Sequence, residues 1–165
     1  MLDSSSAIYL AILGMLPKIL EADAELIITK EIASEIAEGV EKGYKDAFII
    51  EELIKNRKIK VKSTTTKERM KRDYNLKDAD ASVVALAMEN DCLLATEDGT
   101  LQNLAKSLGL KITNTATLLD YAYGKGQLLK KQCLMLLELL AHYGYNKELI
   151  LKVKERILTE GESDE

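Results

Sequence analysis

Four acidic residues stand where a chain of alternating strands and helices would place ligand-binding groups. Asp3 follows the first apolar residues, Asp98 follows the apolar run CLLAT, and Asp80 lies in the first turn of a predicted helix over 78–90. In open parallel sheets, ligands bind outside the carboxyl ends of the strands. The sequence therefore predicts three carboxylates at or beside one edge of a sheet.

The fourth acid is selected by helical periodicity from three glutamates in the segment KEIASEIAEGV, residues 30–40. At about 100° per residue, the apolar residues of this segment form one stripe. They are Ile32, Ala33, Ile36, Ala37 and Val40. Glu31 and Glu38 point nearly opposite to that stripe, whereas Glu35 flanks it. We therefore expect the side chain of Glu35 to point along the edge of the sheet.

A cluster of carboxylates without basic partners is unstable by itself, because each negative charge raises the pKa of the others. A divalent cation relieves this repulsion, and oxygen ligands without His or Cys favour Mg²⁺ or Mn²⁺ over zinc. Beside a phosphodiester, such an ion lowers the pKa of a bound water, orients it for in-line attack and neutralises the leaving oxygen. The chemistry predicted for the four acids is hydrolysis of a phosphodiester backbone.

Each acid also has a purely structural interpretation. Asp98 could simply cap the helix that follows, and Asp80 could simply match the positive end of its own helix. The conjunction of four acids at matched positions favours a site over four separate caps. Glu97, next to Asp98, is expected to point away from the cluster.

A strongly basic stretch, residues 55–72, contrasts with the net charge of −4. It holds nine Lys/Arg and one acid, a local charge of +8, so the remaining residues sum to −12. Such a strip can dock nucleic-acid phosphates without reading their sequence, but a solvated loop and a lysine-protected edge strand give the same pattern. The candidate nucleic-acid-binding residues are Lys58, Lys60, Lys62, Lys67, Arg69, Lys71 and Arg72.

The elements that must position these residues follow an alternating order. Short apolar runs alternate with helical patterns up to about residue 114, which predicts an α/β fold, a three-layer sandwich around a mostly parallel sheet of four or five strands. Strands are expected at residues 1–3, 25–29, 58–61, 92–96 and 110–113. Helices are expected at residues 4–14, 30–40, 44–56, 78–90, 100–108 and 114–124, followed by helical patterns alone from residue 127. The predicted divisions are an α/β domain of residues 1–124, a helical extension of residues 125–158 packed on it, and a disordered tail of residues 159–165.

Length and composition narrow the class of protein. The 165 residues, with 47% apolar and 30% charged side chains, are typical of one compact domain. No leader opens the chain and no apolar run reaches the ~18 residues that span a bilayer, so a cytoplasmic protein without membrane contact is expected. Cys92 and Cys133 follow no metal-binding spacing, which favours buried thiols. The single histidine, His142, has no second histidine with which to form a zinc site, and a role on a helix surface or in the core is expected.

Several segments, taken in order, resemble the PIN domain, a nuclease fold of toxins in toxin–antitoxin pairs and of RNA-processing enzymes. They are LDSSSAI, TKEIASEI and LKDADASVVALAMENDCLLATEDGTLQNLAKSLGLKI. The family pattern has an Asp and hydroxyl residues after the first strand, a Glu in the helix after the second strand, an Asp opening an apolar helix, and an Asp after a strand ending in Thr. Carried over to this sequence, these acids are Asp3, Glu35, Asp80 and Asp98, with Ser5 and Thr96 as supporting hydroxyls.

The resemblance implies an Mg²⁺- or Mn²⁺-dependent endoribonuclease that acts on RNA. Asp3, Asp80 and Asp98 would hold the metal, and Glu35 would complete the cluster or orient water. An antitoxin protein is an implied partner, and relatives of this family commonly form homodimers.

A second hypothesis is a PIN-like protein- or RNA-binding module with little turnover, motivated by the helical C-terminal segment. The tyrosines of that segment could line a partner surface, although packing in the core is the expectation. They are Tyr121, Tyr123, Tyr143 and Tyr145.

Overall fold

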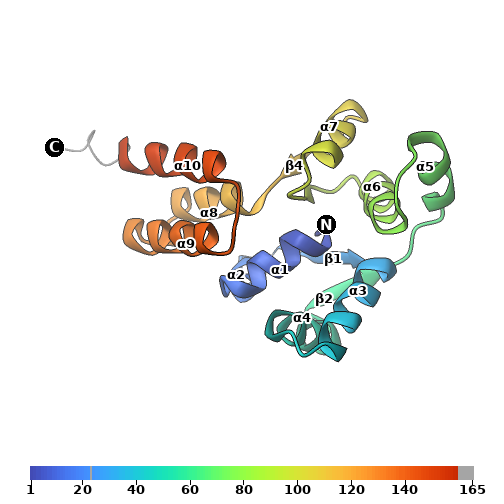
Figure 1. Ribbon diagram of the computed structural model, residues 1–165, viewed down its shortest axis with the longest axis horizontal. Coiled ribbons are helices and arrows are strands. Elements are labelled where there is room, and N and C mark those ends of the chain that lie inside the picture. The colour runs from blue at the N-terminus through green and yellow to red at the C-terminus, as the bar shows by residue number, and fades with distance from the viewer. Residues whose placement is uncertain (23, 160–165) are drawn as a thin grey trace. The chain divides into compact units, whose positions relative to one another are not determined.

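The structure is a computed structural model, which describes residues 1–22 and 24–159. The chain divides into two compact units, one of residues Met1–Thr113 and one that begins at Asn114 (Figure 1). We call them the α/β unit and the helical unit. Of the predicted tail, Thr159 is the last residue of a helix, and residues 160–165 lie outside the described residues.

The α/β unit alternates helices and short strands along the chain. Its strands are β1 Leu26–Thr29, β2 Ile59–Lys62, β3 Leu94–Ala95 and β4 Ile112–Thr113. Its helices are α1 Ser4–Ile12, α2 Met15–Glu21, α3 Lys30–Glu41, α4 Lys45–Lys55, α5 Lys67–Tyr74, α6 Asp78–Asn90 and α7 Gly99–Ser107. The alternation predicted from sequence is confirmed in order, with two additional helices, α2 and α5.

The strands form two parallel pairs, β1 with β2 and β3 with β4. The first residues of the chain lie between the pairs: the Leu2 N–H donates to the Ile27 carbonyl at 2.9 Å, and the Asp3 N–H donates to the Ala95 carbonyl at 3.1 Å. Leu2 forms only an isolated bridge with Ala95. The predicted continuous sheet of four or five strands is therefore present as two small sheets, with Leu2 and Asp3 hydrogen-bonded to one strand of each.

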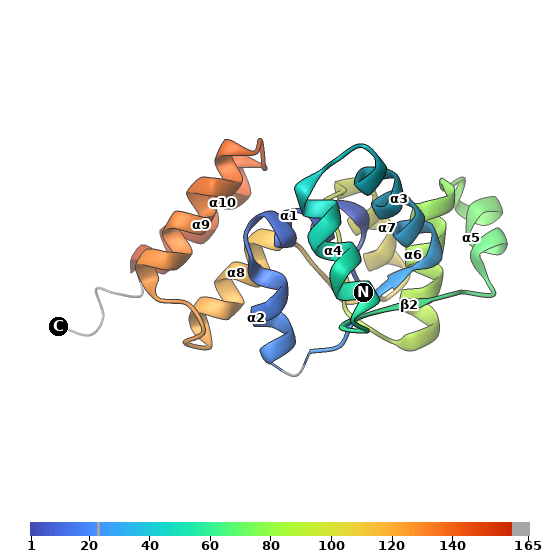
Figure 2. The ribbon, with the colours of Figure 1, turned by 90° about the horizontal axis from the view of Figure 1, so that it is seen from below.

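Helices cover the strands through apolar faces. In α3, Ile32 and Ile36 of the predicted stripe are buried, whereas Ala33 and Val40 are only partly buried and Ala37 is exposed. α3 packs against α4 and β1 (Figure 2). A Cβ on Gly39 would lie 2.9 Å from the Cβ of Ala47, so the close approach of α3 and α4 depends on that glycine. α6, whose residues from Ala81 to Ala87 are all buried, packs on β1, β3 and α5.

The two helices that were not predicted have local causes. Gly14 adopts the left-handed conformation, with φ of 65°, and divides the predicted helix 4–14 from a new helix that starts at Met15. α5 begins in the basic stretch, which was expected to be loop and edge strand; its one buried apolar side chain is Met70. With so narrow an apolar face, the sequence shows no helical period there.

The helical unit consists of α8 Thr115–Gly124, α9 Lys130–His142 and α10 Lys147–Thr159. Because α8 packs against both α9 and α10, the division of the chain lies before α8 rather than after residue 124. Of the four tyrosines, Tyr145 is buried and its hydroxyl accepts from the Ala116 N–H at 3.2 Å, whereas Tyr121 and Tyr143 are exposed.

Both cysteines are free, Cys133 buried and Cys92 only partly, and His142 ends α9 at the surface. Within the described residues, no helix has the length and apolar character needed to cross a membrane.

Candidate active site

Asp3 stands at the junction between the first strand-like residues and α1. Its side chain caps α1, where Oδ1 accepts from the Ser6 N–H at 2.7 Å. The Ser5 hydroxyl donates to both carboxylate oxygens, at 3.1 and 3.2 Å. The carboxylate is buried, with 8% of the residue exposed, so these hydrogen bonds replace the water that it has lost.

Asp98 has the equivalent position after β3. Its Oδ1 accepts from the Leu101 N–H at 2.8 Å and caps α7, while its own N–H donates to the Thr96 hydroxyl at 3.2 Å. Thr96 is fully buried, and its carbonyl accepts from the Gln102 side chain at 2.7 Å. Asp98 itself is exposed, so the cap leaves the carboxylate accessible from solvent.

Glu35 lies one turn into α3, on the exposed side of the buried stripe. Its carboxylate accepts from the hydroxyl of Ser4, the first residue of α1. This contact joins α3 to the start of the helix that Asp3 caps. Ser4 was not among the predicted residues, although the run of three serines after Asp3 was the available signal.

Asp80 lies in the first turn of α6, and the charges of the other three acids affect its pKa. Burial raises its pKa, and the negative charges of Asp98, Asp3 and Glu35 raise it further, against the opposing effect of Lys77. Its carboxylate has no hydrogen bond to any residue that the structure describes. The four predicted acids therefore lie close enough for their charges to be felt at Asp80.

Glu97 does not point away from this region, contrary to the sequence-based expectation. Its Oε1 accepts from the Ser6 hydroxyl at 3.0 Å, and the N–H of the same serine binds Asp3. The reason is that Ser6 is buried at the start of α1, beside the end of β3, and its hydroxyl needs a partner. Glu97 is therefore a further carboxylate at the edge of the cluster.

The acids match a divalent cation in charge and in donor type, but they are not pre-assembled ligands. In residues 1–22 and 24–159, no three His, Cys, Asp or Glu side chains are arranged to hold a metal ion. Oxygens of Asp3 and Asp98 cap helices, and Glu35 is held by Ser4. An ion would have to draw the carboxylates of Asp80 and its neighbours closer together.

The basic residues of the predicted strip are mostly paired with acids. Lys60 lies 2.7 Å and Lys62 3.6 Å from Glu25, and both Arg69 and Arg72 lie near Asp73. Lys58 has no ion pair within the described part of the chain. Nearby acids therefore neutralise much of the positive charge that the sequence of the strip predicts.

Two further lysines of the strip meet at the start of α6. Lys67 binds Glu31 and Asp78, each at 2.7 Å, and Lys71 lies 2.6 Å from Asp78. Hydrogen bonds from Lys67 and Lys71 lower the pKa of Asp78. Both lysines therefore form ion pairs with Asp78, which precedes Asp80 by two residues in α6.

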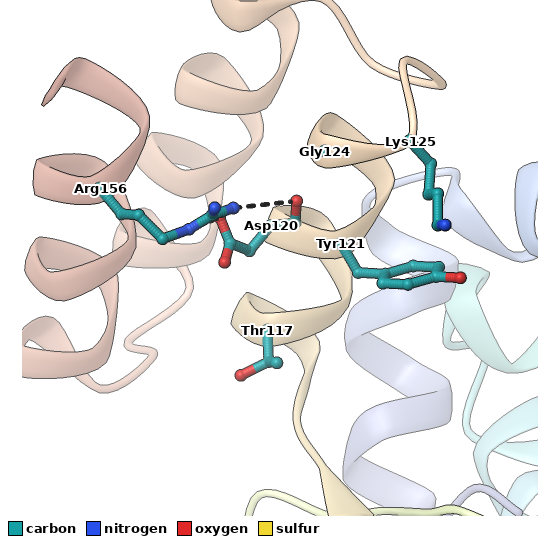
Figure 3. Close-up of a pocket in the computed structure, with 6 residues that line it drawn as sticks. All are labelled: Thr117, Asp120, Tyr121, Gly124, Lys125 and Arg156. Carbon is teal, nitrogen blue, oxygen red and sulfur yellow. Dashed lines mark hydrogen bonds and ion pairs between the residues drawn. The ribbon is translucent and has the colours of Figure 1, made fainter. Parts of the chain in front are cut away.

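A separate open pocket of about 430 Å³ lies in the helical unit (Figure 3). Arg156 of α10 binds the carboxylate of Asp120 of α8, and the Lys125 ammonium lies 5.5 Å from the centre of the Tyr121 ring. Arg156 and Asp120 therefore neutralise each other across the pocket. The arrangement links α8 to α10 and holds none of the four acids.

Comparison with known proteins identifies one family. A protein-family model described as a PIN domain, DUF3368, matches residues 1–159. No curated protein matches the sequence.

Proposed function

The chain belongs to the PIN domain family, whose members are generally nucleases, and we propose that it is a metal-dependent endoribonuclease. The observation that carries the proposal is the electrostatics of Asp80. Burial and three neighbouring carboxylates raise its pKa, with only Lys77 in opposition. A group of acids that is unfavourable in the absence of a cation gains most when a cation binds.

In this proposal Asp3, Asp80 and Asp98 hold Mg²⁺ or Mn²⁺, and Glu35 completes the cluster or orients the attacking water. The bound ion supplies a water of lowered pKa and neutralises the charge that develops on the leaving oxygen. The hydroxyl groups keep the acids in place. Ser5 holds Asp3, Ser4 holds Glu35, and Thr96 holds the backbone of Asp98.

RNA is the proposed substrate. Of the seven candidate residues named from the sequence, Lys58 is the best candidate for a phosphate contact, because it has no ion pair with an acid among the described residues. Lys60 and Lys62 would have to leave Glu25 before they could bind a phosphate. Action as the toxin of a toxin–antitoxin pair, with an antitoxin as partner, belongs to the same proposal.

The second candidate is a PIN-like binding module with little turnover. The observation that favours it is that the acids of the described residues do not already form a metal-binding group. In that case the protein would bind RNA or a protein partner and would not cleave RNA.

Cleavage of a labelled single-stranded RNA with Mn²⁺, with and without EDTA, tests the proposal. The variant is Asp80→Asn, and its matched control is Asp46→Asn, which removes an Asp from the first turn of α4. We expect Mn²⁺-dependent cleavage by the wild type and the control, and a loss of at least a hundredfold in Asp80→Asn. Wild-type cleavage no faster than that of Asp80→Asn refutes the proposal; RNA binding without Mn²⁺ binding would favour the binding module.

A further inference from the structure

Lys67 joins the two helices that carry Glu35 and Asp80. From α5 its ammonium group donates to Glu31 of α3 and to Asp78 of α6, both at 2.7 Å. Both acids lie in the first turns of their helices. One side chain therefore connects the N-terminal ends of α3 and α6.

The acids that Lys67 binds are adjacent to the candidate active site in sequence and on the helix surface. Glu31 precedes Glu35 by four residues, which is one turn of α3, and it is partly buried against Lys67 rather than pointing away from the core as the periodicity predicted. Asp78 precedes Asp80 by two residues in the first turn of α6. A shift of either helix start would change the separation of Glu35 and Asp80.

A second, buried contact joins the same two helix starts. The Ser82 hydroxyl of α6 donates at 2.8 Å to Thr29 Oγ1, which in turn caps α3 by accepting from the Ile32 N–H. Lys67 and Ser82 thus connect α3 and α6 at two separate contacts. With two contacts, neither helix can rotate about a single contact point.

Lys67 is poorly suited to the RNA contact that its place in the basic strip predicts. The lysine and Glu31 are each only about one fifth exposed, at 23% and 22%, and two carboxylates already neutralise the ammonium. A phosphate would have to displace both. These contacts indicate that Lys67 connects Glu31 to Asp78 and does not bind an RNA phosphate.

We propose that Lys67 is a positioning residue, which holds the starts of α3 and α6 so that Glu35 and Asp80 face the same cation. This inference rests on the proposed nuclease function. It adds to that function a residue outside the four acids, and it replaces the docking role of Lys67.

The test compares the wild-type chain with Lys67→Met, Lys67→Arg and the control Lys152→Met. Lys152 also forms an ion pair, at 2.8 Å with Glu148, but both residues lie in α10, so this pair contacts neither α3 nor α6. The measurements are the Kd for Mn²⁺ by calorimetry, the kcat and KM for RNA cleavage, and the melting temperature.

The expected result for Lys67→Met is a weakening of Mn²⁺ binding of about tenfold, the lower end for residues that orient metal ligands. The kcat should fall with KM little changed, Lys67→Arg should restore most of the Mn²⁺ affinity and of the kcat, and Lys152→Met should match wild type. The sign of the Mn²⁺ effect is decisive. Removing a positive charge near the cation would by itself tighten Mn²⁺ binding, whereas loss of positioning weakens it.

Three results would overturn the proposal. Tighter Mn²⁺ binding in Lys67→Met would mean that Lys67 acts only through its charge, and a higher KM with unchanged kcat would mean that it contacts RNA. A lower melting temperature with unchanged Kd, kcat and KM would mean that it only stabilises the fold. Failure of the proposed nuclease function has a different signature, because the wild type itself would then neither bind Mn²⁺ nor cleave RNA.

Discussion

Substitution of Asp98 separates its role as a helix cap from its role as a metal ligand. Asp98 caps α7 through one oxygen, at 2.8 Å from the Leu101 nitrogen. Asparagine caps helices about as well as aspartate, because its side-chain oxygen accepts the same hydrogen bond, whereas alanine cannot cap. The pair Asp98→Asn and Asp98→Ala therefore changes the charge in both variants and the cap in only one.

The expected magnitudes differ clearly. Loss of an N-cap lowers the free energy of unfolding by about 1 kcal/mol. For a chain of this size that corresponds to roughly 2–4 °C in Tm. Asp98→Ala should therefore melt a few degrees below wild type in EDTA. Asp98→Asn should melt no lower than wild type, since it keeps the cap and removes one of the charges that raise the pKa of Asp80.

Activity should not follow stability in these variants. If Asp98 is a ligand, both variants lose Mn²⁺-dependent cleavage to a similar extent, as measured on labelled RNA well below either Tm. Asn146→Ala is the matched control, because Asn146 accepts from the Glu148 N–H at 2.9 Å at the start of α10, in the helical unit, which carries none of the four acids. Wild-type cleavage by Asp98→Asn would refute the reasoning and leave Asp98 as a cap alone.

Two other expectations concern titratable groups. Because burial and neighbouring carboxylates raise the pKa of Asp80, the folded state binds its proton more tightly than the unfolded chain, and stability falls as pH rises from about 4 through the raised pKa. In EDTA at pH 7, Asp80→Asn should therefore melt above wild type, and the difference should vanish below about pH 4; a less stable variant at pH 7 would contradict this. Burial, with a contribution from Asp120, raises the pKa of the Cys133 thiol to about 11, so a thiol reagent at pH 8 should modify Cys92 first and Cys133 only on unfolding. Two thiols reacting at the same rate in the native protein would refute it.

The parts of the fold with a strong period were predictable from the sequence. The stripe in α3 identified both the helix and its buried residues Ile32 and Ile36, and apolar runs located β1 and β2 within one or two residues. α5 was missed because it has little apolar face; its ends are held instead by distant acids. The Glu89 carboxylate accepts from Thr64, Thr65 and Thr66 just before the helix, contacts that no local pattern shows.

The candidate site also has features that the sequence predicts and contacts that it does not. The ends of strands are visible in sequence, so the apolar pattern alone predicts Asp3 and Asp98 at one edge of the sheet. The contacts of Ser4 with Glu35 and of Ser6 with Glu97 join residues 31 and 91 positions apart. They depend on the angle at which α1 leaves Asp3, which sequence does not encode locally. Membership of the PIN family is confirmed by comparison, while the roles of the individual acids stay predictions.

The position of Leu2 and Asp3 between the two strand pairs has a consequence for the timing of synthesis. Their partners are Ile27 on one side and Ala95 on the other, so the hydrogen bonds to Ala95 cannot form until that residue has left the ribosome. Contacts so distant in sequence close late in folding. Asp3 therefore reaches its place beside the end of β3 only after Ala95 has been synthesised. In a growing chain, Asp3 is not yet held at the strand edge that Asp98 follows.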